Sequence, residues 1–192
     1  MTFDPRYFKP MVVIDTCAVW NILSAQKLYR AANTAKLTFL MTPMVLYECA
    51  YKPRNEPSPE QIELSKRFRS AREDGAFTIQ ACALDDLLAV SLNAPVALGS
   101  GELSCIAMAY RMSTVAVMTD DLQARRYAES KISLRVETTP RLYGWLHYCR
   151  HLSDGDHPEI MAEHERYERR PLTTFFNEAY TSSLEYRLMD SS

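Results

Sequence analysis

Residues 99–121, GSGELSCIAMAYRMSTVAVMTDD, place an acid at each end of a single helix–strand unit. The glycine-rich start predicts a sharp turn into a helix near Glu102. Apolar residues then recur at helical spacing, and residues 115–118 are typical of a short buried strand that ends at Asp120. A helix of about 11 residues and a strand of about five residues each span roughly 16 Å, so Asp120 returns to the level of Glu102.

A second acid at the end of a strand precedes this unit. Residues 11–14 form an unbroken apolar run, which is suited to a central strand covered on both faces. Asp15 and Thr16 follow, and a helical pattern extends over residues 17–32. Open α/β sheets bind ligands at the carboxyl ends of such strands. The alternative is that Asp15 only caps the following helix.

A further acid lies within an apolar helix. Residues 37–41 predict a second strand, and Thr42 and Pro43 are a helix-start signal. Glu48 follows among apolar residues, where an unpaired buried carboxylate would be costly. Glu48 therefore either has a cation or partner, or faces solvent.

Strands and helices alternate over residues 11–150, with further strands expected at 77–81 and 132–137. This alternation predicts an α/β fold, a three-layer α/β/α sandwich around a central, mostly parallel sheet. We expect residues 1–150 to form one domain. Residues 151–158 suggest a hinge, and residues 151–192 a helical acidic extension that packs on the body or binds a partner.

Composition indicates a globular protein, since 47% of the 192 residues are hydrophobic and 24% are charged. The five cysteines show no CxxC spacing, so we interpret them as reduced core residues. Without a membrane-length apolar run or a signal-peptide pattern, we expect a cytoplasmic protein with no membrane association. Residues 1–150 carry 18 Lys and Arg against 15 Asp and Glu, whereas residues 151–192 carry 4 against 9.

The acids form a candidate metal site. Parallel strands end at one edge of a sheet, so side chains at that edge can converge. Clustered carboxylates repel one another and require a cation, and oxygen-only ligands favour Mg²⁺ or Mn²⁺. Such a centre suits hydrolysis of a phosphodiester. The candidate acids are Asp15, Glu48, Glu102 and Asp120, with Asp121 mainly a helix cap and secondary ligand.

Four segments together resemble the PIN domain, in particular toxin ribonucleases of the VapC type. They are VVIDT, TPMVLYE, GSGELSCIAMA and VMTDDLQARR, and the resemblance covers roughly residues 11–150. The glycine–acid loop before the helix and the TDD strand end are its most specific parts. Two features depart from the family pattern. Glu102 stands where many members have Asp, and the acidic extension is longer than compact toxins need.

The resemblance implies a metal-dependent endoribonuclease that leaves a 5′-phosphate and a 3′-hydroxyl. In this reading Asp15, Glu48, Glu102 and Asp120 are catalytic and hold one or two Mg²⁺ or Mn²⁺ ions. Thr16, Ser100 and Thr119 would orient these carboxylates. The residues expected to contact the RNA backbone are Lys52, Arg54, Arg125 and Arg126. The resemblance also implies a homodimer and a toxin held inactive by an antitoxin protein.

Other functions fit the same sequence. A PIN-like module could bind RNA or protein without cutting it, although such a module has no need to keep all four acids. A structure-specific DNA nuclease is a further alternative, because the metal site does not distinguish RNA from DNA. A haloacid-dehalogenase type of phosphotransferase would need a second Asp two residues after Asp15, where Cys17 stands.

Overall fold

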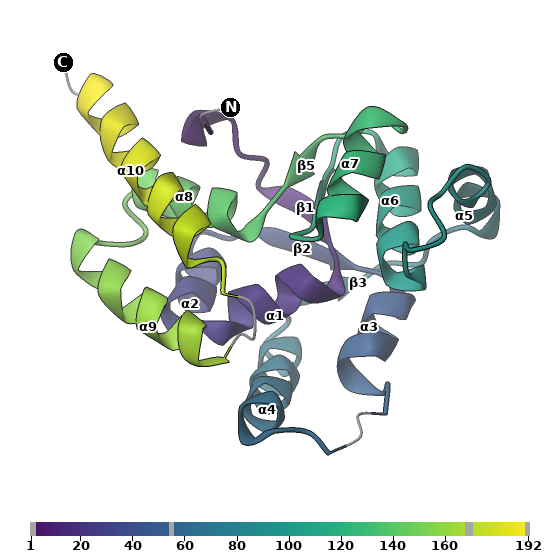
Figure 1. The fold of residues 1–192 in the computed structure, drawn as a ribbon, viewed down its shortest axis with the longest axis horizontal. Coiled ribbons are helices and arrows are strands. Elements are labelled where there is room, and N and C mark those ends of the chain that lie inside the picture. Colours follow the sequence, from purple (N-terminus) through teal and green to yellow (C-terminus); the bar gives the residue numbers. More distant parts are fainter. Residues whose placement is uncertain (1–2, 54–55, 168–170, 191–192) are drawn as a thin grey trace. The chain divides into compact units, whose positions relative to one another are not determined.

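The computed structural model describes residues 3–53, 56–167 and 171–190, and Figure 1 shows their secondary structure. The chain forms two compact units. The unit that we call the sheet unit comprises Lys9–Trp20 and Thr38–Glu137, and the helical unit comprises Met1–Phe8, Asn21–Leu37 and Thr138–Ser192. This grouping differs from the expected division at residue 150, because residues 1–8, 21–37 and 138–150 group with the C-terminal extension.

Five parallel strands, in the part of the chain that the structure describes, make up the central sheet in the order β3-β2-β1-β4-β5. They are β1 Met11–Ile14, β2 Thr38–Met41, β3 Phe77–Ile79, β4 Ala116–Met118 and β5 Val136–Glu137. In β1, Val13 lies opposite Leu40 of β2 and Val117 of β4. Val13 is fully buried, as its central position requires.

Helices cover both faces of this sheet. They are α3 Pro43–Ala50, α4 Pro59–Glu73, α5 Leu84–Ser91, α6 Ser100–Met112 and α7 Leu122–Ser130. The chain moves outward from β2 to β3 through α4, and outward in the opposite direction from β4 to β5 through α7. Because such crossovers are right-handed, α4 and α7 lie on opposite faces. The predicted three-layer α/β/α fold is thus confirmed.

The strand order creates a switch point between β1 and β4. From β1 the chain proceeds to β2 on one side, and from β4 it proceeds to β5 on the other. Open α/β sheets bind their ligands outside the carboxyl ends of strands at such a point. The two segments that begin there are residues 15–17 and residues 119–121.

Two expected elements differ from those observed. The helix predicted over residues 17–32 is divided at Ala25, whose backbone is extended, into α1 Thr16–Ser24 and α2 Gln26–Thr34. The last strand begins at Val136 rather than at residue 132. Ser133 has a φ of 59°, and this left-handed conformation is incompatible with a strand.

The helical unit includes α8 Thr139–Tyr148, α9 His157–Tyr167 and α10 Thr173–Met189. Two 3₁₀ helices, η1 Pro5–Tyr7 and η2 Asp154–Asp156, belong to the same unit. α10 packs on α8, where the rings of Tyr143 and Phe176 meet edge to face at 5.0 Å. The predicted helix over residues 159–170 is observed to Tyr167, and its last three residues lie outside the described part. No described helix is long and apolar enough to cross a membrane.

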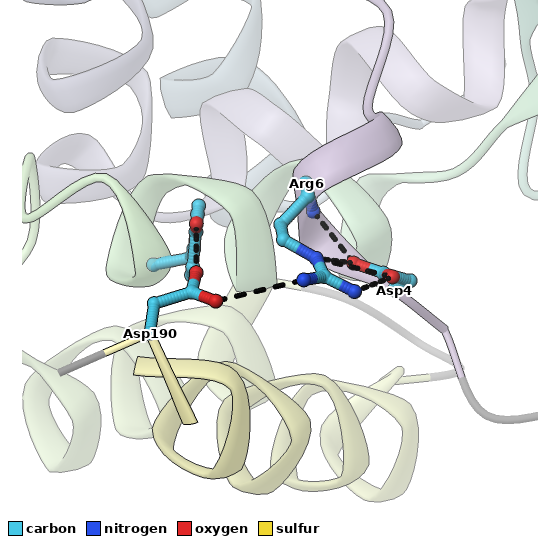
Figure 2. A network of polar contacts seen from close by, with 4 residues as sticks. Asp4, Arg6 and Asp190 are labelled. Carbon is cyan, nitrogen blue, oxygen red and sulfur yellow. Dashed lines mark hydrogen bonds and ion pairs between the residues drawn. The ribbon is translucent and has the colours of Figure 1, made fainter. Parts of the chain in front are cut away.

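A polar network joins η1 to the end of α10 within the helical unit (Figure 2). The Arg6 guanidinium pairs with Asp4 at 2.8 Å and with Asp190 at 3.5 Å. The Tyr148 hydroxyl donates to the same Asp190 carboxylate at 2.5 Å. Arg6 also lies over the Tyr186 ring. Arg6 and Asp190 are exposed, so their ion pair adds little to the stability of the fold.

Gly144 of α8 lies against Ala179 of α10, and its replacement tests this packing. A β-carbon at position 144 would lie 2.9 Å from the Ala179 carbonyl oxygen and 3.0 Å from the Phe3 ring. We expect Gly144→Ala to lower the free energy of unfolding by about 1–3 kcal/mol in urea denaturation. Gly155→Ala is the control, because its nearest atom would be 3.8 Å away. Equal stability of both variants would contradict the packing argument.

Candidate active site

Two acids follow directly paired strands at the switch point. Ile14 of β1 lies opposite Met118 of β4, and the Asp15 amide donates to the Met118 carbonyl at 3.0 Å. Asp15 begins the connection after β1, and Asp120 lies two residues beyond β4. The two acids therefore follow neighbouring strands of the sheet.

Asp15 is an almost fully buried carboxylate, with 2% of its surface exposed. Its Oδ1 accepts the Ala18 amide hydrogen at 2.9 Å. Burial raises the pKa of Asp15 to about 7, and the charge of Asp120 acts in the same direction. Hydrogen bonds from Thr119, Ala18 and Cys17 oppose this rise in pKa only in part. Asp15 thus holds either a proton or a charge that lacks a counter-ion.

Thr119 and Asp121 organise the segment after β4. Thr119 is buried, and its Oγ1 accepts the Asp121 amide hydrogen at 3.1 Å. Asp121 is exposed, and its Oδ1 accepts the Ala124 amide hydrogen at 2.8 Å at the start of α7. The prediction that Asp121 caps this helix is confirmed.

Glu48 is held between α1 and α6 rather than facing solvent freely. The Thr16 hydroxyl of α1 donates to Glu48 Oε2. A β-carbon at Gly101 of α6 would lie 2.7 Å from that same oxygen. Glu48 is half-buried, and the Thr16 hydroxyl holds its carboxylate in this position.

Glu102 folds back on the start of its own helix. A β-carbon at Gly99, the residue that precedes α6, would lie 2.5 Å from Glu102 Oε2. The carboxylate therefore lies at the positive end of the helix dipole, as a first-turn acid commonly does. Ser100, the expected orienting residue of this loop, is exposed.

Three residues that sequence reasoning did not select build this edge of the sheet. Cys17 contacts the Asp15 carboxylate with its thiol. Thr42 and Ser104 share a hydrogen bond of 2.7 Å, and Ser104 also donates to the Gly101 carbonyl at 2.8 Å. The position of Cys17, two residues after a strand-end acid, was the available signal. Thr42 carried only the signal of a helix cap.

The expected RNA-binding residues lie on α7 and after α3. Lys52 and Arg126 are exposed. Arg125 is half-buried, and its buried Nε has no acceptor within the described residues. Because this Nε is enclosed by the protein, the exposed side chains of Lys52 and Arg126 are better placed to meet a phosphate group from solvent. Arg54 lies outside the described residues.

The candidate carboxylates offer the oxygen ligands that a hard divalent cation prefers, but they do not surround a single ion position. Their donors are oxygen atoms, and the buried Asp15 carboxylate needs a neutralising charge. Among the described residues, no group of three or more His, Cys, Asp or Glu side chains is placed to hold one ion. Glu48 and Glu102 instead contact Thr16 and Gly99, which accounts for this dispersed arrangement.

Gly101→Ala tests the position of Glu48. The new methyl group would displace the Glu48 carboxylate from the Thr16 hydroxyl, because only the end of a flexible side chain opposes it. We expect affinity for Mn²⁺ to fall by about tenfold. The unfolding free energy should change by less than about 1 kcal/mol, since alanine is favourable in a helix. Unchanged Mn²⁺ binding in a calorimetric titration would contradict a ligand role for Glu48.

Comparison with known proteins agrees with this geometry. A family model described as DUF3368, PIN domain, matches residues 11–139. The chain belongs to this PIN domain family. The matched range begins with β1 and ends just after β5, so it contains the whole sheet and every candidate acid. No curated protein and no solved structure matches the chain. PIN domains are generally nucleases and typically use divalent metals.

Proposed function

We propose that this PIN domain is a metal-dependent endoribonuclease. The observation that supports the proposal most strongly is the buried Asp15 carboxylate beside Asp120 at the switch point of the sheet. Burying an acid there without a compensating charge is unfavourable, so its retention is best explained by a ligand. Membership of a family whose members are generally nucleases supports a cation used in phosphodiester hydrolysis as that ligand.

The residues that would hold Mg²⁺ or Mn²⁺ are Asp15, Glu48, Glu102 and Asp120, with Asp121 as a secondary ligand. When bound, the ion would neutralise charge on the phosphodiester and lower the pKa of water. The protein's own groups then fix the acids in place. The Ala18 amide holds the Asp15 carboxylate, the Thr16 hydroxyl holds Glu48, and Thr119 anchors the segment that carries Asp120 and Asp121.

The substrate would lie along the first turns of α7. Arg125 and Arg126 lie in the first turns of this helix, a few residues after Asp120, and the Arg126 side chain is exposed. Lys52 is exposed after α3, the helix that carries Glu48. Contacts of this kind follow the sugar–phosphate backbone and do not select a sequence.

Cleavage of matched RNA and DNA strands tests the reaction class. The purified full chain is incubated with both strands in Mg²⁺ or Mn²⁺, and parallel reactions contain EDTA. We expect RNA cleavage that EDTA abolishes, with 5′-phosphate and 3′-hydroxyl ends. Preferential DNA cleavage would favour the DNA nuclease, and RNA binding without cleavage would favour the binding module. The toxin role, its antitoxin, the homodimer and the cytoplasmic location stay predictions.

A further inference from the structure

Cys17 contacts both segments that carry the strand-end acids. Its sulfur lies 3.1 Å from each carboxylate oxygen of Asp15. The Asp120 amide donates to the same sulfur at 3.3 Å, and the Thr119 hydroxyl lies 3.8 Å away. Cys17 is in the first turn of α1, so one side chain joins the end of β1 to the end of β4.

The two hydrogen bonds of this sulfur are compatible only with a protonated thiol. A thiol has one weak donor, which can point to the Asp15 carboxylate, and a sulfur that accepts the Asp120 amide hydrogen. A thiolate at this position would face the carboxylates of Asp15 and Asp120 without a donor of its own.

We propose that Cys17 is a positioning residue that sets the distance and orientation of Asp15 relative to Asp120. This inference rests on the proposed function, because it assigns Cys17 a role in the same metal centre. Groups that orient metal-binding side chains typically change metal affinity by 10–100-fold when they are removed. A residue that only filled space would not need two polar contacts to two different strands.

Three variants separate positioning from packing. Cys17→Ala removes both hydrogen bonds, whereas Cys17→Ser keeps a donor and an acceptor. Cys105→Ala is the control, because Cys105 is a buried cysteine that donates to the Ile14 carbonyl at 3.3 Å and not to a carboxylate. The thermal unfolding temperature of each variant is measured first. This measurement shows that a loss of Mn²⁺ affinity does not come from unfolding of the variant.

Hydrogen exchange of the Asp120 amide is the readout that needs neither metal nor substrate. We expect this amide to exchange at least tenfold faster in Cys17→Ala than in the wild type, with partial recovery of protection in Cys17→Ser. Affinity for Mn²⁺ should fall by about tenfold in Cys17→Ala and recover to within about threefold in Cys17→Ser. Cys105→Ala should leave both quantities within about twofold of the wild type.

Either of two results overturns the proposal. The first is wild-type exchange of the Asp120 amide in Cys17→Ala. The second is equal loss of Mn²⁺ affinity in the alanine and serine variants, which would indicate packing alone. Failure of the proposed function is distinct, because it is seen in the wild type as absent cleavage or absent Mn²⁺ binding. In that case the exchange of the Asp120 amide alone decides whether Cys17 joins the two strands.

Discussion

Asp15→Asn is expected to lower kcat/KM for RNA cleavage by at least about a thousandfold, or about 4 kcal/mol of transition-state stabilisation. The substitution keeps the size of the side chain and can still accept the Ala18 amide hydrogen. It removes the buried negative charge that would attract Mg²⁺ or Mn²⁺ at the switch point. Asp120→Asn should have a similar effect. The measurement is the initial rate on a defined RNA at saturating Mn²⁺.

Asp74→Asn is the control for this experiment, because Asp74 is an exposed residue at the C-terminal end of α4. It removes the same charge from the chain without altering the switch point, and its rate should lie within about twofold of the wild type. Cleavage by Asp15→Asn at the rate of Asp74→Asn would contradict the assignment of Asp15.

The same Asp15→Asn substitution should stabilise the metal-free protein at neutral and higher pH. Because the pKa of Asp15 is raised to about 7 in the folded protein, from 3.8 ordinarily, the folded state holds its proton more tightly than the unfolded chain. The contribution of Asp15 to stability is fully present below about pH 4, falls as the pH rises, and is lost above about pH 7. Asn carries no such charge. In EDTA at pH 8 the variant should gain on the order of 2–4 kcal/mol.

Urea denaturation at pH 4 and at pH 8, with EDTA present, measures this difference directly. The wild type and Asp15→Asn should have similar free energies of unfolding at pH 4 and diverge at pH 8. Mn²⁺ should narrow this difference at pH 8, because the wild type binds the ion more tightly than the variant and therefore gains more stability from it. A constant difference between the two proteins at both pH values would mean that Asp15 carries no raised pKa.

Local patterns were enough to predict the framework of the site. The apolar run before Asp15 forms the central strand, and the run before Asp120 forms its neighbour. Thr42 caps α3, as the Thr-Pro signal indicates. Each of these features depends on a few adjacent residues, which a sequence displays directly.

Features that depend on distant contacts could not be predicted. The Glu48 carboxylate accepts the hydroxyl hydrogen of Thr16, which lies 32 residues earlier in the chain. Cys17 looks like a small core residue in the sequence, and only the pairing of β1 with β4 brings Asp120 to its sulfur. The grouping of α8 with α9 and α10 likewise depends on long-range contacts, such as those of Tyr143 and Gly144 with α10. No local sequence pattern predicts these contacts.

The central claim is that Asp15 and Asp120 together bind a divalent cation for RNA cleavage. A titration of Mn²⁺ into the full-length chain, followed by electron paramagnetic resonance, measures this binding without any substrate. We expect saturable binding by the wild type and loss of at least about tenfold in affinity in both Asp15→Asn and Asp120→Asn. Binding of Mn²⁺ with equal affinity by the wild type and both variants would contradict the claim.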